Sequence, residues 1–339
     1  MKIKHFGIIV IIVLYTQTLI AQQISKVGTT SMTFLKIDAG ARQVGMGSAC
    51  VASTEDALGL YWNPSSIARL QQSHVVFNHI NWIADISYNY AAVAIPMNNV
   101  GSFGVSATFV SMDPIVRTTV DFPAGTGETF DASNYAIALS YARNLTDRFS
   151  VGGSAKIVSE EIFNCTARGL AFDVGLMFTT QFHGLQMGMS ISNYGTKVKM
   201  DGRDLLIQTD IDKSRSGNNE TINAVLKTEQ YDLPLFFRVG VSMDMLKGAG
   251  HSNFIVSIDA LHPNDDVEYV NIGAEYMLYN MLALRGGYKT LFARDSEEGL
   301  SLGAGLKLNM LRYHIQVDYA WRDFGRLGNI QMFTLGFLF

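Results

Sequence analysis

The side chains of this sequence that could act as catalytic bases are its seven histidines. A hydrolase needs a nucleophile, a base within hydrogen-bonding distance and a third group that orients the base. His79 and His314 lie in strand-like stretches, and no Ser or Asp near them in the sequence completes such a triad. The others lie in the N-terminal apolar run or near predicted strand ends: His5, His74, His183, His251 and His262. We therefore predict no catalytic residues and no enzymatic activity.

Two groups of acidic residues are the candidates for a Ca²⁺ site, because Ca²⁺ prefers oxygen ligands. One group contains Asp265, Asp266 and Glu268, and the other is spread over residues 201–212. Neither has the spacing of Asp, Gly and Glu that an EF-hand loop requires. We interpret both groups as solvated surface loops, and we predict no metal ion and no other cofactor.

Residues 38–70 differ from the rest of the chain, because Gly40, Gly45 and Gly47 interrupt any regular element there. A phosphate-binding loop would need a preceding strand and a following Gly-Lys-Ser/Thr, and both are missing, which argues against nucleotide binding. Close packing of the backbone in a narrow space explains these glycines better. We predict that the segment folds as a compact plug inside the structure that the following residues build.

Two short helices are predicted within this segment. One begins in residues 54–58 and is capped by Ser53 or Thr54. The other covers residues 67–70 and is capped by Ser65, just after the turn that Asn63 and Pro64 favour.

Residues 1–21 are typical of a cleaved secretory signal peptide. Lys2 and Lys4 give the positive start, residues 7–14 form the apolar run, and a cleavage site precedes Gln22. The run is too short for a retained membrane helix, which needs about 20 apolar residues. Removing the peptide leaves 24 basic and 30 acidic residues, so the mature chain has no electrostatic basis for binding nucleic acid.

Cys50 and Cys165 are the two cysteines of the sequence. An exported chain can join such a pair in a disulfide. The two lie in different contexts, one in the predicted plug and one beside a loop, so we favour two buried or half-buried thiols and leave their pairing open.

From residue 74 onward the dominant pattern has a period of two, which indicates β-strands. In residues 235–243, for example, every second side chain is apolar and the side chains between them are Arg238, Gly240 and Ser242. Similar alternation recurs to the end of the chain. The faces between the apolar ones carry charged residues: Lys156, Asp173, Arg238, Asp259, Glu275, Arg285, Lys307 and Asp318.

Most of these stretches have the length that a tilted strand needs to cross a bilayer, with lipid on one face and a polar lumen on the other. An open sheet edge in hydrocarbon would leave backbone groups without partners, so the pattern predicts a closed transmembrane antiparallel β-barrel. We count about 14 strands. Their predicted cores are residues 74–81, 85–95, 100–111, 133–143, 148–162, 168–179, 184–193, 234–245, 251–262, 267–278, 281–291, 298–309, 311–321 and 330–339.

The connections test this count. If both ends of the barrel domain are periplasmic, every second connection should be a short periplasmic turn. The sequence has this pattern, and the two long connections, residues 113–132 and 193–232, both fall on the outer side. We predict three parts: a signal peptide in residues 1–21, an N-terminal segment with the plug in residues 22–73, and a barrel in residues 74–339.

In the last seven residues, every second side chain is aromatic or leucine. This pattern resembles the C-terminal signal that the barrel-assembly machinery of the outer membrane recognises. The side chains that carry this signal are Phe333, Leu335, Phe337 and Phe339. Aromatic residues near predicted strand ends fit an interfacial girdle. They are Trp82, Trp321, Tyr141 and Tyr276.

The predicted plug also carries a motif. It consists of Phe34-Leu35-Lys36-Ile37, Gly40-Ala41-Arg42, Gly45-Met46-Gly47, Ala52 and Tyr61-Trp62-Asn63-Pro64. This run resembles the N-terminal signature of the PorV/PorQ family, outer-membrane barrels of the FadL-like superfamily. The resemblance implies a 14-stranded barrel with an N-terminal hatch, exported to the outer membrane of a Gram-negative-type bacterium.

The resemblance implies two possible functions. PorV-type members serve type IX secretion and bind exported proteins at the cell surface through a C-terminal signal domain, so secreted proteins or a secretion translocon are the expected partners. FadL-type relatives carry hydrophobic compounds inward, and their hatch has Asn-Pro-Ala where this chain has Asn63-Pro64-Ser65. The second function would need a lipid-like ligand and an opening in the wall, for example at a kink near Gly152-Gly153 or Gly286-Gly287. We favour the first function and keep the second as the alternative.

Overall fold

The computed structural model describes residues 26–212, 214, 221–246, 252–293, 296–310 and 313–339. The predicted signal peptide and its cleavage site lie outside these residues. No helix in the described part of the chain is long and apolar enough to cross a membrane.

The chain forms an all-β barrel of 14 antiparallel strands, in which each strand pairs with its sequence neighbour and the last closes on the first. The strands of the barrel are β1 (His74–Asn81), β2 (Ser87–Met97), β3 (Gly101–Ser111), β6 (Ala132–Thr146), β7 (Phe149–Ile162), β8 (Cys165–Thr179), β9 (Gln186–Gly195), β13 (Phe236–Asp244), β14 (Asn253–Pro263), β15 (Tyr269–Leu278), β16 (Leu282–Leu291), β17 (Leu300–Met310), β18 (Tyr313–Asp323) and β19 (Asn329–Leu338). Closure is through β1 and β19, where Phe77 faces Leu335. The predicted closed antiparallel barrel and its strand count are confirmed.

The alternation in the sequence matches the two faces of the wall. In β3, Phe103, Val105 and Phe109 are exposed on the outer face, whereas Ser106 and Thr108 between them are buried. The charged residues predicted to face the lumen are inside the barrel: Asp173, Arg238, Asp259, Glu275, Arg285 and Asp318 are all buried. A period of two in the sequence thus becomes a lipid-facing surface and a polar interior.

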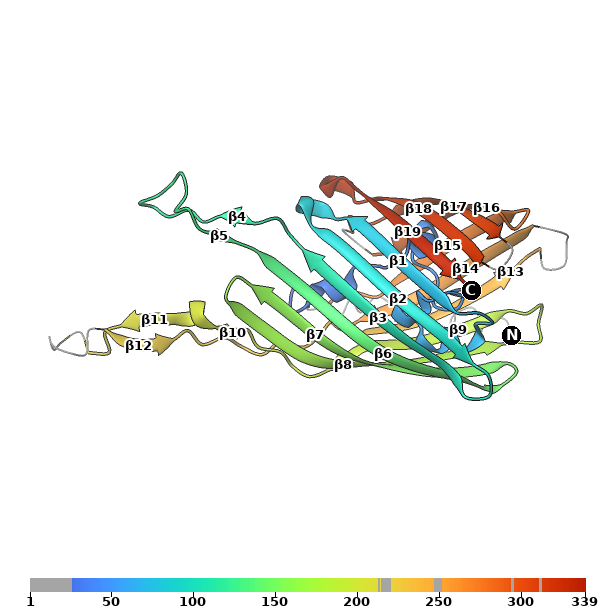
Figure 1. The fold of residues 1–339 in the computed structure, drawn as a ribbon, viewed down its shortest axis with the longest axis horizontal. Coiled ribbons are helices and arrows are strands. Elements are labelled where there is room, and N and C mark those ends of the chain that lie inside the picture. Colours follow the sequence, from blue (N-terminus) through green and yellow to red (C-terminus); the bar gives the residue numbers. More distant parts are fainter. Residues whose placement is uncertain (1–25, 213, 215–220, 247–251, 294–295, 311–312) are drawn as a thin grey trace, which may run out of the picture.

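The two long connections leave the same end of the barrel, as predicted (Figure 1). The first contains the short strands β4 (Ile115–Val116) and β5 (Thr129–Phe130), which pair with each other. The second contains β10 (Asp201–Gly202), which extends the edge of β8, and the pair β11 (Leu206–Thr209) and β12 (Ile222–Val225). We call the end of the barrel from which both long connections leave the hairpin end, and the opposite end the turn end. Short 3₁₀ turns complete the connections: η4 (Ile83–Asp85), η5 (Arg203–Leu205) and η6 (Gly325–Leu327).

Residues 32–70, which we call the inner segment, are mostly buried against inward-facing side chains of the barrel. They contain η2 (Thr33–Lys36), α2 (Ala41–Gly45), α3 (Gly59–Trp62) and η3 (Pro64–Arg69). The segment starts at the hairpin end, where the Ser31 backbone N–H donates to the Asp232 carbonyl at 3.0 Å. It finishes at the turn end, where Ser73 and Phe339 exchange backbone hydrogen bonds just before β1 begins.

The predicted helix starts in this segment are wrong. Residues 54–58 contain no helix, and α3 begins one turn later, where the Asp56 carboxylate accepts from the Leu58 backbone N–H at 2.8 Å. The cap of η3 is Asn63 and not Ser65, because the Asn63 side chain accepts from the Ser65 N–H and Pro64 occupies the first position of the turn. Proline is well suited to that position, since it has no N–H and a fixed φ.

The interpretation of Asp265 as a solvated loop residue is also wrong. Asp265 is only 2% exposed, and its carboxylate pairs with Lys36 at 3.0 Å and accepts from the Thr30 hydroxyl at 2.6 Å. The start of the inner segment covers this part of the loop between β14 and β15. Glu268 in the same loop stays exposed and contacts His262.

The two cysteines, both in the described part of the chain, are buried and form no disulfide with each other. Cys50 lies in the inner segment, where burial raises the pKa of its thiol well above the usual value. Cys165 is at the start of β8 in the barrel wall. The favoured interpretation of two buried thiols is therefore confirmed.

We predict that epitope tags inserted at Gly125, in the β4–β5 connection, and at Gly28 bind antibody on intact cells, whereas a tag at Asn98 does not. Gly28 has no atom within 4 Å of a Cβ placed on it, and it precedes the point where the chain enters the barrel at the hairpin end. Asn98 lies in the β2–β3 turn at the opposite end. Antibody binding at Asn98 before permeabilisation would contradict this topology. Ser216, a further site in the second long connection, lies outside the described residues.

Candidate functional site

Glycines of the barrel wall let the backbone of the inner segment approach within contact distance. A Cβ placed on Gly287 of β16 would lie 2.3 Å from the Gly47 nitrogen, and one on Gly152 of β7 would lie 2.6 Å from the Pro64 carbonyl carbon. Real Cβ atoms do not come this close to backbone. Gly47 itself has φ +62°, a conformation that glycine adopts at low cost. Close backbone packing was predicted for Gly40, Gly45 and Gly47, and glycines of the wall take part in it as well.

The wall shows no kink at the two glycine pairs where the transport function was expected to need an opening. β7 pairs with β6 and β8 through Gly152 and Gly153 without interruption. β16 likewise pairs with β15 and β17 through Gly286 and Gly287. These glycines provide room for the inner segment and leave the wall closed at both positions.

Arg42 joins the inner segment to β15 by a buried ion pair. Its Nε and Nη2 atoms donate to the two carboxylate oxygens of Glu275, each at 2.9 Å. The same carboxylate accepts from Arg285 Nε at 2.5 Å. Arg285 also donates through Nη1 to the Asp318 carboxylate at 2.7 Å. Two-point pairing fixes both the distance and the orientation of the arginine. The network therefore holds α2 against β15 in one position, and Arg285 of β16 and Asp318 of β18 extend it along the wall.

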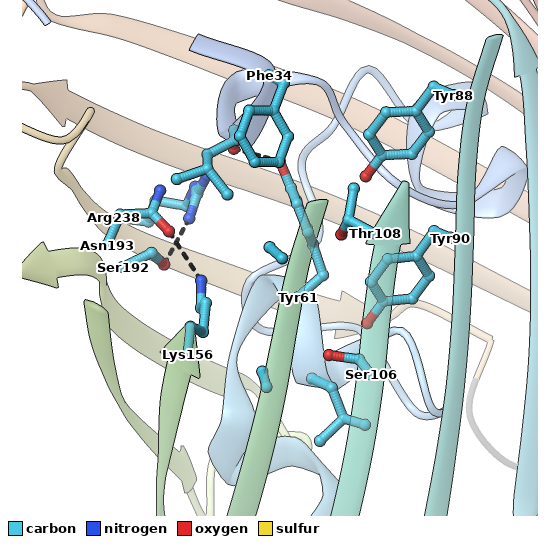
Figure 2. Close-up of a pocket in the computed structure, with 14 residues that line it drawn as sticks. Phe34, Tyr61, Tyr88, Tyr90, Ser106, Thr108, Lys156, Ser192, Asn193 and Arg238 are labelled. Carbon is cyan, nitrogen blue, oxygen red and sulfur yellow. Dashed lines mark hydrogen bonds between the residues drawn. The ribbon is translucent and has the colours of Figure 1, made fainter. Parts of the chain in front are cut away.

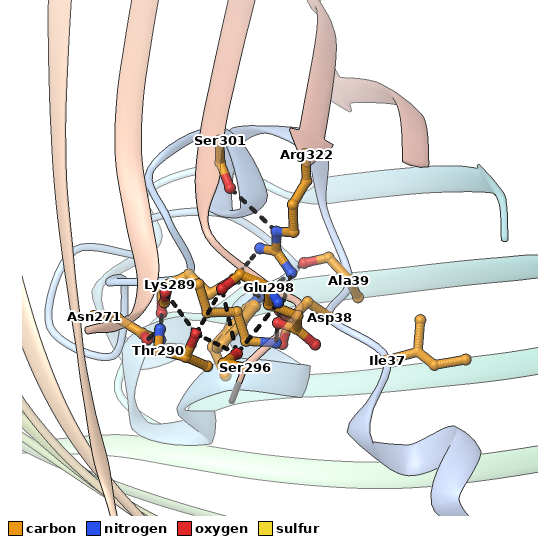
Figure 3. Close-up of polar contacts among 12 residues, drawn as sticks. Ile37, Asp38, Ala39, Asn271, Lys289, Thr290, Ser296, Glu298, Ser301 and Arg322 are labelled. Atoms are coloured by element: carbon orange, nitrogen blue, oxygen red, sulfur yellow. Dashed lines mark hydrogen bonds and ion pairs between the residues drawn. The ribbon is translucent and has the colours of Figure 1, made fainter. Parts of the chain in front are cut away.

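A second network holds the chain just before α2 (Figure 3). The Asp38 carboxylate pairs with Lys289 of β16 at 2.8 Å and with Arg322 of β18 at 2.7 Å, and Glu298 contacts the same lysine. Burial by itself would raise the pKa of Asp38, but the two cations outweigh it and hold this pKa below its usual range. The carboxylate is therefore ionised at every physiological pH.

The motif Tyr61-Trp62-Asn63-Pro64 organises the rest of the segment. The Tyr61 hydroxyl donates to the Leu35 and Ile37 carbonyls, at 3.2 and 2.9 Å, and Trp62 Nε1 donates to the Ala39 carbonyl at 2.8 Å. The Asn63 amide bridges the segment and the wall, because its Nδ2 donates to the Val51 carbonyl at 3.0 Å and to the Leu176 carbonyl of β8 at 3.1 Å.

The structure thus brings together the motif residues of the predicted plug, from Gly40 to Pro64. No motif in the sequence indicates which wall residues they contact. Lys289 and Arg322 occupy positions of the inward-facing parity in β16 and β18, so strand parity could have identified them as lumen residues. The pairing with Asp38 could not be read from spacing. Among the residues predicted to carry the barrel-assembly signal, Phe333, Leu335 and Phe339 are exposed.

The inner segment borders a small cavity near the hairpin end and a wide vestibule at the turn end. The cavity holds about 20 Å³ and is lined by three tyrosines, by Lys156, which donates to Asn193, and by Arg238, which donates to Ser192 (Figure 2). This is room for about one water molecule. The vestibule holds about 590 Å³ and is lined by charged and polar groups that include Lys307 and Glu55. In the described part of the chain, no group of three acidic, His or Cys side chains gathers to hold a metal ion.

The hairpin end carries exposed apolar side chains beyond the barrel. In the first long connection Val120 is 98% exposed and Phe122 is 60% exposed. In the second, Ile211 and Val225 are exposed to a similar degree. Two-stranded hairpins of this kind offer open backbone edges and apolar side chains together, which is a common way to bind an extended partner.

The family model described as "Type IX secretion system protein PorV" matches residues 20–213, more than half of the chain. The chain belongs to the PorV family. A search of curated proteins found no match to this PorV-family chain.

Solved structures with the same fold are FadL-like outer-membrane barrels. A Pseudomonas aeruginosa FadL homologue has a TM-score of 0.51 and 12% identity, over 89% of this chain and 98% of that chain. The Ralstonia pickettii toluene transporter TbuX has a TM-score of 0.54 and 11% identity, over 88% and 97%. The Pseudomonas putida toluene transporter TodX has a TM-score of 0.52 and 12% identity, over 88% and 96%. At these identities the likeness shows only the β-barrel fold. The fold and the PorV family together support the outer membrane as the location of this chain.

We predict that Gly287→Ala disturbs the inner segment of this PorV-family barrel, whereas Gly286→Ala does not. A methyl group on Gly287 collides with Gly47, but one on Gly286 meets only the Leu302 side chain at 3.9 Å. Overpacking of this kind costs about 1–3 kcal/mol. The measurement is urea unfolding of both variants from bilayers, together with the rate at which protease cuts residues 32–70. Equal effects of the two substitutions would show that the contact with Gly47 does not restrain the segment.

We also predict that Glu275→Gln destabilises the barrel by about 3–5 kcal/mol, because it leaves Arg42 and Arg285 buried without their shared carboxylate. Glu128→Gln is the matched control. Glu128 pairs with Arg117 in the first long connection, where both side chains are exposed, and such pairs contribute less than about 1 kcal/mol. The same unfolding measurement compares the two, and similar losses for both would exclude a special role for the buried network.

Proposed function

We propose that this PorV-family barrel binds secreted proteins at the cell surface during type IX secretion, through the two hairpins at its hairpin end. The observation that carries the proposal is that both long connections project from one end and expose apolar residues such as Val120, Phe122 and Val225. The family supplies the link to type IX secretion. The bound element is expected to be the C-terminal signal domain of the cargo, with a translocon as a further partner.

In this proposal the inner segment acts as a plug, or hatch. Its support is the set of contacts that tie residues 32–70 to several strands of the barrel, among them the bidentate pair between Arg42 and Glu275 and the Asn63 bridge to β8. A closed lumen suits a protein that works with its outer surface. The barrel then needs no catalytic group, and we propose no enzymatic activity.

Inward transport of hydrophobic compounds is the second candidate. The structures of similar fold include toluene transporters, and this is a property of those proteins. The cavity beside the inner segment in this chain holds about 20 Å³, which is room for about one water molecule and too little for a monoaromatic hydrocarbon. The closed pairing at Gly152-Gly153 and Gly286-Gly287 likewise removes the predicted lateral openings. The secretion function is therefore favoured.

Phe122→Ser is expected to reduce the amount of cargo that remains bound to the barrel, and its release into the medium, by about fivefold or more, as for an apolar contact worth at least 1 kcal/mol. Phe182→Ser is the matched control, because Phe182 is similarly exposed, at 67% against 60%, but lies in the β8–β9 turn at the opposite end. Bound cargo is measured by quantitative mass spectrometry of gently extracted barrels.

If Phe122→Ser and Phe182→Ser behave alike, the hairpin end is not the docking surface. The second candidate would be favoured by two results together. Secretion would be unchanged in Phe122→Ser, and a monoaromatic hydrocarbon would enter liposomes that contain the wild-type barrel faster than it enters empty liposomes.

A further inference from the structure

The outer wall of the barrel contains a groove that the proposed function does not use. It has a volume of about 410 Å³ and lies over β19, β1, β2 and β3. Its floor includes Ala91 and Ala107, which face each other across β2 and β3. Larger side chains stand around this floor, and Phe77, Phe109 and Phe333 are each about half exposed. Two small residues among aromatic ones thus leave an apolar recess on the face that meets lipid.

A polar cluster, formed by His79, Asn81 and Asn89, borders this groove on the same outer face. The His79 ring contacts the Asn89 side-chain oxygen at 2.8 Å through Nδ1 and the Asn81 side-chain oxygen at 3.1 Å through Nε2. All three side chains are exposed. An imidazole that carries one N–H donates to only one of these two oxygens, so the other asparagine donates one amide N–H to the ring. An Asn amide has two N–H groups, so Asn81 and Asn89 each keep at least one for a ligand on the lipid side.

The register places this cluster among aromatic residues. His79 faces Phe333 on β19 and Asn89 on β2, and Asn89 faces Phe109 on β3. Outward aromatic side chains in a barrel mark the boundary between hydrocarbon and headgroups. Polar groups that face lipid are costly in hydrocarbon and usually mark a functional contact. At this boundary they can reach the oxygen atoms from which acyl chains extend.

The cluster lies near the hairpin end of the wall, because β1 runs from His74 at the turn end to Asn81, two residues after His79. Long connections of bacterial barrels face the outside. The lipid beside the cluster is therefore that of the outer leaflet, which in a Gram-negative outer membrane is lipopolysaccharide. Its acyl chains are attached by ester and amide groups, and phosphates flank them, so it offers acceptors for the amides of Asn81 and Asn89.

We propose that the groove and the polar cluster form a binding site for one molecule of lipopolysaccharide. One acyl chain lies over Ala91 and Ala107 between the phenylalanines, and the carbonyl or phosphate oxygens next to it accept from Asn81 and Asn89, which His79 orients. The site is independent of the lumen, and it adds a specific lipid contact to the proposed secretion function without depending on it.

A second groove provides an internal control. It has the same volume, about 410 Å³, and lies over β3, β6, β7 and β8, where Leu139, Phe172 and Val174 are exposed. No cluster of His and Asn borders it among the described residues. If apolar shape alone retained lipid, both grooves would retain it equally. If the polar cluster selects the lipid, only the first groove will.

The test uses the full-length barrel in its own outer membrane, with a photoreactive phenylalanine analogue at Phe77 in one sample and at Leu139 in another. Cross-linking to lipopolysaccharide is expected at Phe77 and to be at least about fivefold weaker at Leu139. The variant N81L/N89L should reduce the yield at Phe77 by a similar factor and leave that at Leu139 unchanged. Ala91→Phe, which fills the groove but keeps the cluster, should have the same effect as N81L/N89L.

Heat-modified mobility on gels reports whether each variant folds, and Ala91→Phe keeps the proposal testable if N81L/N89L does not. Equal yields at the two positions would overturn the proposal, and so would a yield at Phe77 that neither variant lowers. A product at Phe77 that contains mainly phospholipid would refute the choice of lipid, and one that contains a protein would show that the groove is a protein interface.

Discussion

The structure depends on the requirement that every backbone group at membrane depth has a hydrogen-bond partner within the protein. The chain meets it by closing β19 onto β1, where eight consecutive residue pairs form the seam. Closure makes a wall with no free edge. It also creates an interior that must be filled, because a barrel of this size has polar inward-facing side chains on all sides.

The inner segment fills part of that interior, and two kinds of contact determine its position. Glycines of the wall, such as Gly152 and Gly287, allow backbone to lie against backbone. Buried ion pairs then fix the register, since Arg42 pairs with Glu275 of β15 and Asp38 pairs with Arg322 of β18. Buried pairs of this sort add little stability compared with apolar packing, but removing one partner is costly. They therefore specify where the segment lies more than how tightly the barrel folds.

The two ends of the barrel are chemically different. Short turns and a polar vestibule lie at one end, whereas the hairpins, the start of the inner segment and the outer cluster around His79 lie at the other. In the proposed function, the surfaces that contact secreted proteins lie on one side of the membrane. The arrangement also separates two kinds of surface at that end: apolar side chains on projecting hairpins, which lie beyond the wall, and a polar cluster on the wall itself, which faces lipid.

The sequence by itself determined the strands, their number and the common end from which the two long connections leave, because side-chain direction in a strand alternates with a fixed period. The motif around Gly40 and Tyr61-Trp62-Asn63-Pro64 also indicated the family. Tertiary structure decided the rest. The residues of the pair Arg42 and Glu275 are 233 positions apart, and only barrel closure brings them together. The sequence predicts that Asp265 is a solvated loop residue, but in the structure it is buried, because the start of the inner segment covers it. The local sequence pattern predicts whether a side chain points into the barrel or out of it. Its contact partner, however, depends on which distant strand lies nearby once the barrel has closed.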